Sequence, residues 1–181
     1  DGPEAFLSGS IVDLQSRYNL NNLYKDSTVM AEEVEILKRL CGSIGVGAEV
    51  ATTLATAINA AQVRTGTDPA IDAPLMPQSV SQLTWLGLDP DTVQRLAPHV
   101  VLLPARTAVN VNTASREVLA AVIKGLDLAT AERLVQTRQR TPFKTLAELE
   151  AQIPTLAPLN GQQIGVATNF FEVRGKLRLT D

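Results

Sequence analysis

The sequence predicts an α+β protein in which strand-forming segments at the two ends of the chain flank a long helical middle. Residues 9–20 alternate between apolar and polar side chains, as a strand with one buried face does. Residues 171–179 alternate in the same way near the other end of the chain. Between them, apolar residues recur at three- and four-residue spacings, which is typical of helices. We expect the two strands to share an antiparallel sheet, with the helical region inserted between them, because loop-closure entropy rises slowly with length.

The C-terminal segment shows the clearest alternation. Phe171, Val173, Leu177 and Leu179 fall on one side of a strand, and Gly175 lies in the same row. Charged side chains occupy the other side of the strand: Glu172, Arg174, Lys176 and Arg178. The pattern predicts a strand with one face packed against the protein and one face in water.

Two helices are predicted after the first strand. The first covers residues 27–41, with Ser27 or Thr28 as its N-cap. The second covers residues 47–64 and is rich in Ala and Thr. Residues 65–78 contain three prolines and are expected to form an exposed connector.

An internal repeat is the most informative local feature. The segments GLDPDTVQRL and GLDLATAERL carry Gly, Leu, Asp, Thr, Arg and Leu at matching places, over residues 87–96 and 125–134. Each copy is expected to form a helix, a tight turn and a second helix. Glycine permits a positive φ at the turn, and the aspartate caps the helix that follows. We therefore expect four residues to hold the turns: Gly87, Asp89, Gly125 and Asp127.

The segments around the second copy also have predicted roles. Residues 100–104 form an apolar run and are expected to be buried and extended. In the stretch VNVNTA, the side chains of Asn110 and Asn112 are expected to bond backbone groups at the start of the next helix, with Thr113 as its N-cap. A further helix is predicted at residues 145–152.

Composition excludes several classes of protein. The net charge is −3 and the pI is about 5.2, whereas a chain that grips phosphates usually has a basic total or a basic face. One cysteine and one histidine exclude a disulfide within the chain and a zinc site of the Cys or Cys/His type. No apolar run is long enough to span a bilayer. The first residue is not Met, and the opening Asp-Gly-Pro suggests an interior point of a longer protein.

Nothing in the sequence favours an enzyme. His99 follows a proline in an apolar stretch with no nucleophile or carboxylate motif beside it. Cys41 and Trp85 are expected to be core residues. The glutamates at positions 32, 33 and 35 are expected to form a solvated helix face.

Three collinear segments resemble the general secretion pathway protein K family, the largest minor pseudopilins of the type II secretion system. Residues 11–23, IVDLQSRYNLNNL, resemble the family's VDxQGRFNLNNL strand. Residues 109–121, VNVNTASREVLAA, resemble its INVNTAPxxVLAAL element, and residues 170–179 resemble its terminal strand.

The resemblance implies a domain division. Residues 1–25 and 166–181 would form a pseudopilin-type antiparallel sheet, and residues 26–165 an inserted, mostly α-helical domain. The helix-hairpin-helix-like repeats of that domain would lie near residues 79–98 and 113–140.

The resemblance also implies partners and a location. The chain would be the periplasmic domain of a protein anchored in the inner membrane of a Gram-negative bacterium by an N-terminal helix absent from this sequence. It would form a heterotrimer with the I- and J-type minor pseudopilins and contact the inner-membrane secretion platform. Some family members bind calcium after the second helix, where this chain offers only Asp68 and Asp72. Because calcium takes six to eight oxygen ligands, we see no evident cofactor site, although calcium stays an implication of the resemblance.

A DNA-binding module is the alternative interpretation. Residues 109–149 also resemble the helix-hairpin-helix module of competence-type DNA receptors. In DNA-binding copies the turn is usually Gly-hydrophobic-Gly, and its N–H groups meet phosphate. Here Asp89 and Asp127 replace the second glycine and place negative charge at that point, so nucleic acid is the less favoured partner. Basic residues do occur nearby: Lys124, Arg133, Arg138, Arg140 and Lys144.

Overall fold

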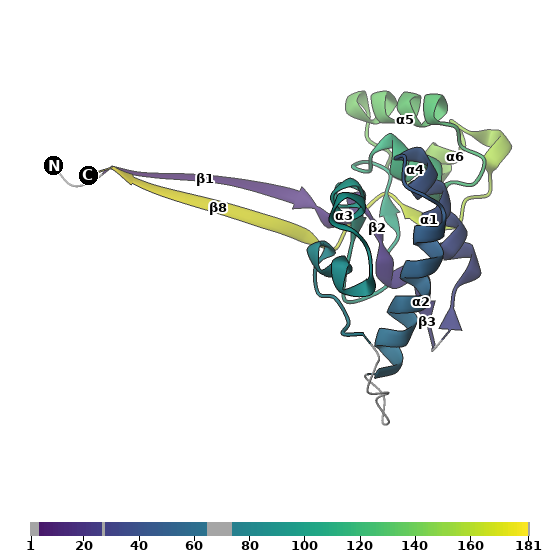
Figure 1. Ribbon diagram of the computed structural model, residues 1–181. Helices are drawn as coiled ribbons and strands as arrows, with labels where there is room; N and C mark the ends of the chain where they lie inside the picture. The colour runs from purple at the N-terminus through teal and green to yellow at the C-terminus, as the bar shows by residue number, and fades with distance from the viewer. Residues whose placement is uncertain (1–3, 27, 65–73, 181) are drawn as a thin grey trace.

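The computed structural model describes residues 4–26, 28–64 and 74–180, which form a helical body and a long two-stranded ribbon that projects from it (Figure 1). The body contains helices α1 to α6 and several short strands. The ribbon consists of β1 (Glu4–Asp13) and β8 (Phe171–Thr180), so the two ends of the described chain meet at its tip.

The ribbon confirms that the two terminal strands pair antiparallel. Ladder pairs run from Glu4↔Thr180 at the tip to Asp13↔Phe171 at the base. The expectation of a half-buried strand is wrong, since the ribbon lies beside no other described strand and most of its described side chains are exposed. The fold therefore places an isolated two-stranded sheet in solvent, and such a sheet is marginal without further packing.

The first predicted strand is shorter at its C-terminal end than expected. Instead of continuing to residue 20, it ends at Asp13, whose carboxylate accepts a hydrogen bond from the Gln15 N–H and caps the 3-10 turn η1 (Leu14–Ser16). The chain then enters the body through four short elements: β2 (Tyr18–Asn19), η2 (Leu20–Leu23), β3 (Tyr24–Lys25) and β4 (Thr28–Val29). Residues 14–25, grouped above with the terminal sheet, thus pack in the helical body.

Helices α1 (Ala31–Ser43) and α2 (Glu49–Arg64) lie close to their predicted positions and pack against each other. The cap predicted for α1 is wrong. Thr28 lies in β4, Met30 occupies the N-cap position without a side-chain bond, and Ser27 lies outside the described residues. Most of the predicted connector, residues 65–73, also lies outside them.

The repeated segments form two helix-turn-helix units. The first comprises the 3-10 helix η3 (Val80–Leu86) and α3 (Pro90–Leu96), and the second comprises α4 (Arg116–Val122) and α5 (Leu128–Arg140). Gly87 and Gly125 lie at the turns with φ of 89° and 87°. A side chain at either position would be strained, because φ in this range is left-handed.

Two short parallel strand pairs connect segments of the body that are distant in sequence. β5 (Val100–Val101), the predicted buried run, pairs with β2, and β6 (Val109–Asn110) pairs with β7 (Ile164–Gly165). The last helices are α6 (Leu146–Glu150) and the 3-10 helix η4 (Pro154–Leu156). Parallel pairing joins the region before β8 to the middle of the chain, which places the base of the ribbon against β6.

One aliphatic core holds the body together, as the low aromatic content predicts. Its largest fully buried side chains are Tyr18, Leu20, Leu23, Ile36, Leu37, Leu40, Leu54, Ile58, Leu83, Leu96, Leu119 and Leu149. Cys41 belongs to this core, but the expectation for Trp85 is wrong, since its side chain is 52% exposed. Residues three apart share a face of a 3-10 helix, so Leu83 and Leu86 point inward and Trp85 does not.

Candidate interaction surface

The ribbon has one apolar face. Residues directly opposite each other in a ladder lie on the same face, and so do residues two apart along a strand. The register therefore places the pairs Leu7↔Leu177 and Ile11↔Val173 on one face, with Phe171 at the base of the same row.

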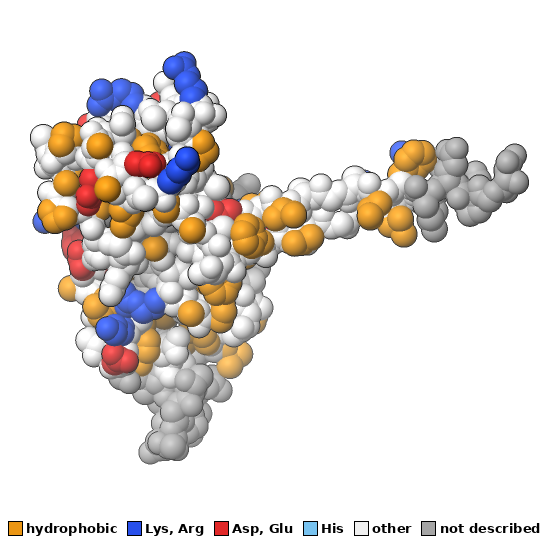
Figure 2. Space-filling view, turned by 180° about the vertical axis from the view of Figure 1, so that it is seen from behind, with side chains coloured by type: hydrophobic (Ala, Val, Ile, Leu, Met, Phe, Trp, Pro, Cys, Tyr) orange, Lys and Arg blue, Asp and Glu red, His pale blue; other side chains and the backbone are white. Residues whose placement is uncertain are grey.

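These side chains are all more than half exposed. The exposed fractions are 80% for Leu7, 72% for Ile11, 73% for Val173, 63% for Leu177 and 55% for Phe171. Figure 2 shows hydrophobic side chains along the ribbon, gathered near its base and again toward its tip. Exposed apolar surface of this kind is typical of sites where a protein partner or a membrane makes contact.

A glycine pair interrupts the apolar row at its centre. Gly9 lies opposite Gly175, between the two aliphatic pairs. Those pairs are four residues apart on each strand, a separation of about 14 Å at about 3.4 Å per residue. The row therefore has a gap at its centre where the ribbon backbone is not covered by side chains of this face.

The opposite face of the ribbon is more polar and carries basic side chains, and it also holds Phe6, which lies opposite Arg178 and is 56% exposed. The register places Ser8 opposite Lys176 and Ser10 opposite Arg174 on this face. The Arg174 guanidinium lies 2.7 Å from Glu172, and both side chains are on the same strand. The ribbon thus presents two chemically different faces, which makes a matched mutational comparison feasible.

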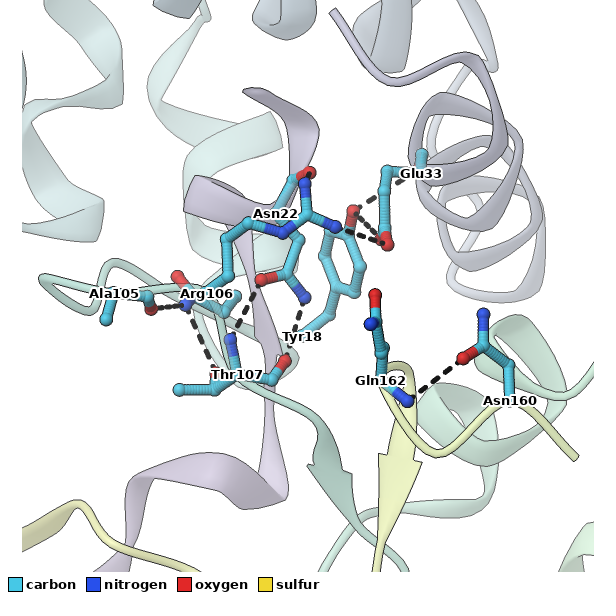
Figure 3. Close-up of polar contacts among 9 residues, drawn as sticks. Tyr18, Asn22, Glu33, Ala105, Arg106, Thr107, Asn160 and Gln162 are labelled. Atoms are coloured by element: carbon cyan, nitrogen blue, oxygen red, sulfur yellow. Dashed lines mark hydrogen bonds and ion pairs between the residues drawn. The ribbon is translucent and has the colours of Figure 1, made fainter. Parts of the chain in front are cut away.

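The asparagines that follow the first ribbon strand bond backbone groups inside the body. The buried Asn19 side chain donates to the carbonyl of Ala105 at 2.7 Å and accepts from the Leu103 N–H at 3.1 Å. Asn22 makes the same two-way bond to the Thr107 backbone, at 2.9 and 3.1 Å (Figure 3). These amides replace the strand partners that the loop at residues 103–107 does not have, so the motif specifies packing.

A buried ionic cluster lies beside this loop (Figure 3). Glu33, expected in a solvated face, is only 3% exposed. Its carboxylate accepts a hydrogen bond from the Tyr18 hydroxyl at 3.0 Å and lies 3.4 Å from the Arg106 guanidinium. Burial raises the pKa of the Glu33 carboxyl, and the bonds from Tyr18 and Arg106 only partly offset this effect. Burial also raises the pKa of Tyr18, and the nearby carboxylate raises it further.

The turn residues make local bonds. Asp89 accepts from the Thr92 N–H at 3.0 Å, and Asp127 accepts from the Thr130 N–H at 2.8 Å and from its hydroxyl at 2.9 Å. These bonds lower the pKa of both carboxyls, so each turn carries an ionised aspartate at neutral pH. At both turns this carboxylate occupies a helix-start N–H group, the kind of donor that a phosphate would need.

The asparagines of the VNVNTA stretch reach further than predicted. Asn112 bonds both backbone groups of Phe143, at 2.9 Å each, and the Val166 carbonyl at 3.0 Å, instead of the start of α4. Asn110 donates to the Asp13 carboxylate at 2.8 Å. The predicted cap Thr113 also bonds Asp13, and Ser115 is the N-cap of α4.

The residues considered for catalysis have structural surroundings. Cys41 is buried, and burial raises the pKa of its thiol to about 11, which keeps it in the unreactive protonated form. His99 is half-buried, its ring lies 3.4 Å from the Ser115 hydroxyl, and burial lowers its pKa. In residues 4–26, 28–64 and 74–180 no group of three or more His, Cys, Asp or Glu side chains is placed to hold a metal ion. Asp68 and Asp72 lie outside the described residues.

Sequence comparison assigns the chain to a family. Two models described as type II secretion system (T2SS), protein K match residues 16–105 and 109–168. The chain belongs to the type II secretion system protein K family. Both ribbon strands lie outside the matched ranges, so the match rests on the helical body.

Two relatives agree with this assignment. The type II secretion system protein K of Pseudomonas aeruginosa is 30% identical over 198 residues, which cover 100% of this chain and 59% of that protein. The fold is similar to that in the crystal structure of the GspK-GspI-GspJ complex from the enterotoxigenic Escherichia coli type 2 secretion system. The TM-score is 0.68 at 22% identity, and the match covers 98% of this chain and 74% of that chain. Among the described residues, the structure contains no helix long and apolar enough to cross a membrane.

Sequence reasoning missed two features, one exposed and one buried. The exposure of the ribbon was missed because strict alternation looks the same whether the apolar face is covered by its own chain or by another. The ion pair of Glu33 was missed because Arg106 lies 73 residues away in the sequence.

Proposed function

We propose that this chain is the periplasmic part of a minor pseudopilin that forms the tip of the type II secretion pseudopilus with I- and J-type subunits. In this role it promotes assembly of the pseudopilus for protein export across the outer membrane. Membership of the protein K family supports the proposal, as does the similarity of its fold to a chain solved in a GspK-GspI-GspJ complex. The function is assembly through protein–protein contact and needs no catalytic residue.

The exposed apolar face of the ribbon is the observation that carries the proposal. Burying one leucine or valine side chain contributes about 1.5–3 kcal/mol. The face holds Leu7, Ile11, Val173 and Leu177, all more than half exposed, so covering it would contribute substantially to association. At Gly9 and Gly175, which have no side chains, a partner could approach the ribbon backbone closely.

The wider setting is part of the same proposal. An N-terminal helix preceding this segment would anchor the protein in the inner membrane of a Gram-negative cell, and the membrane end would contact the secretion platform. Because an isolated ribbon is marginally stable, we expect the anchoring helix and the partner subunits to share the apolar face.

DNA binding is the second candidate, favoured by the helix-turn-helix units alone. The ionised Asp89 and Asp127 at the two turns argue against it, since each occupies a backbone donor and repels phosphate. A net charge of −3 points the same way.

Light scattering after size-exclusion chromatography separates the two candidates. The chain is mixed with the periplasmic domains of I- and J-type minor pseudopilins and, separately, with short double-stranded DNA at physiological salt. The proposal predicts a ternary complex with the pseudopilin domains and free DNA in the second mixture. DNA binding that weakens with salt, with no pseudopilin complex, would replace the proposal with the DNA-binding alternative.

A further inference from the structure

The ribbon joins the body through two neighbouring backbone links. β1 ends at Asp13, and β8 begins at its ladder partner Phe171. One further backbone bond, from the Leu14 N–H to the Phe170 carbonyl at 3.0 Å, continues the ladder into the body. The ribbon is therefore connected to the body only by two neighbouring chain segments, one from each strand. The backbone alone would let the ribbon rotate about the line that joins these two segments.

Asp13 opposes this motion from the β1 side. One oxygen of its carboxylate accepts from the Gln15 N–H at 2.7 Å. The other accepts from the Asn110 side chain at 2.8 Å and from the Thr113 hydroxyl. Asn110 is buried in β6, which pairs with β7 in the body, so the carboxylate ties the end of β1 to the body through side chains as well as the backbone.

Gln15 opposes the motion from the β8 side. It is 5% exposed, and its amide donates to the Ala108 carbonyl, next to β6, at 2.8 Å. Its carbonyl oxygen accepts from the Asn169 N–H at 2.6 Å and from the Thr168 hydroxyl at 3.1 Å, just before β8. Both strands of the ribbon are thus fastened to the same part of the body.

We propose that Asp13 and Gln15 are positioning residues that fix the direction of the ribbon relative to the helical body. The angle at which the apolar face meets a partner is then set before binding. A surface ordered in advance loses less conformational entropy on association, and bonds to a carboxylate are roughly twice as strong as neutral ones. The consequence for assembly rests on the proposed function, whereas the fixed direction is a property of the isolated chain.

The test measures the ribbon direction in the isolated chain by pulsed electron paramagnetic resonance. Spin labels are placed at Ser8→Cys on the ribbon and Gln139→Cys on α5, both exposed positions. Cys41 does not compete for the label, because it is buried and burial raises its thiol pKa to about 11. The measured quantity is the width of the distance distribution between the two labels.

Three variants make the test specific. Asp13→Asn keeps an acceptor for the Gln15 N–H but puts an NH₂ group where Asn110 and Thr113 donate. Thr113→Val removes one of these bonds and leaves the carboxylate. Asp127→Asn is the matched control, since it makes the same chemical change at a helix cap with no bond to the ribbon.

The inference predicts a narrow distribution for the unsubstituted chain and for Asp127→Asn. For Asp13→Asn it predicts a width at least about twofold greater, with an intermediate width for Thr113→Val. Equal, narrow distributions in Asp13→Asn and Thr113→Val would overturn it. If Asp13→Asn loses its cooperative melting transition, Thr113→Val decides in the same way.

A binding measurement separates this inference from the proposed function. Asp13→Asn should bind the I- and J-type domains about tenfold more weakly than the unsubstituted chain. If the unsubstituted chain does not bind them, the proposed function fails while the width measurement still decides the positioning role. If Asp13→Asn has a wide distribution but unchanged affinity, the proposed consequence for assembly is wrong.

Discussion

Replacing Glu33 tests whether the buried cluster holds α1 to the segment that follows the ribbon. The carboxylate is 3% exposed and bonds Tyr18 and Arg106, which come from two other parts of the chain. Glu33→Ala removes both bonds. Glu33→Gln keeps an oxygen acceptor for the Tyr18 hydroxyl and removes the buried negative charge.

The structure sets the size of the effect. Removing one partner of a fully buried ion pair costs about 3–5 kcal/mol. The Arg106 side chain is 31% exposed and also donates to the Asn22 carbonyl, while Tyr18 has a second acceptor in the Glu33 main-chain carbonyl at 3.3 Å. The loss for Glu33→Ala therefore falls to about 1–3 kcal/mol of unfolding free energy. At about 2–4 °C per kcal/mol, its melting temperature should fall by about 4–8 °C for a loss of about 2 kcal/mol.

The pH dependence distinguishes the two variants of Glu33. Burial raises its pKa in the folded state, so between the unfolded and folded pKa values the folded chain binds more protons than the unfolded chain. The contribution of this carboxyl to stability is therefore greatest below the unfolded pKa and is lost as pH rises through the folded pKa. Glu33→Gln should remove this dependence, so the unsubstituted chain should gain stability relative to Glu33→Gln as pH falls from 7 to 4.

Thermal unfolding measures the melting temperatures, and urea unfolding at several pH values measures the pH dependence of the unfolding free energy. Glu35→Ala is the control, because Glu35 lies on the same helix in an exposed pair with Lys38 and its loss should leave the melting temperature unchanged. Parallel pH profiles for the unsubstituted chain and Glu33→Gln would refute the assigned role of burial. So would a melting temperature for Glu33→Ala equal to that of Glu35→Ala.

Three further predictions concern the body. Gly125→Val should lower the unfolding free energy by about 1 kcal/mol or more because of the positive φ, whereas Gly42→Ala, in a helix with open space beside it, should raise it by about 0.5–1 kcal/mol; equal thermal shifts would contradict the assigned turn. Arg138→Glu should destabilise the fold, because the half-buried guanidinium donates to the Val111 carbonyl, while the exposed Lys124→Glu should leave the melting temperature unchanged. If calcium binds only where described residues group metal ligands, calcium or EDTA should leave the melting temperature unchanged, and a shift with calcium alone would indicate a site that includes residues outside the described ranges, such as Asp68 and Asp72.

Local signals in the sequence predicted the elements of the body well. Apolar spacing located α1 and α2, and the terminal alternation identified the pairing of β1 with β8. The repeated Gly-Leu-Asp segments identified two turns where a positive φ and an aspartate cap coincide. Each of these helices, strands and turns depends on residues within a few positions of each other, so a single sequence is enough to locate it.

Features that depend on distant residues were not predictable in this way. Alternation predicted that β8 has an apolar face but not that the face is uncovered, which depends on what packs against it. The run from Asp13 to Leu20 was interpreted as strand, whereas the polar side chains between Asp13 and Asn22 bond the loop at residues 103–108 and the chain before β8. Glu33 was assigned to solvent because its partner Arg106 is remote in sequence.

The most direct test of the account compares one substitution on each face of the ribbon. Leu177→Gln places an amide in the apolar face, and Ser8→Gln places the same side chain on the opposite face, one ladder position away. Calorimetric titration with the I- and J-type domains measures both affinities, and the melting temperatures of both variants should match that of the unsubstituted chain. The account predicts that Leu177→Gln weakens binding by about 10- to 100-fold, from the loss of about 1.5–3 kcal/mol of apolar burial, and that Ser8→Gln binds normally. Equal affinities for the two variants would show that the apolar face of the ribbon is not the assembly surface.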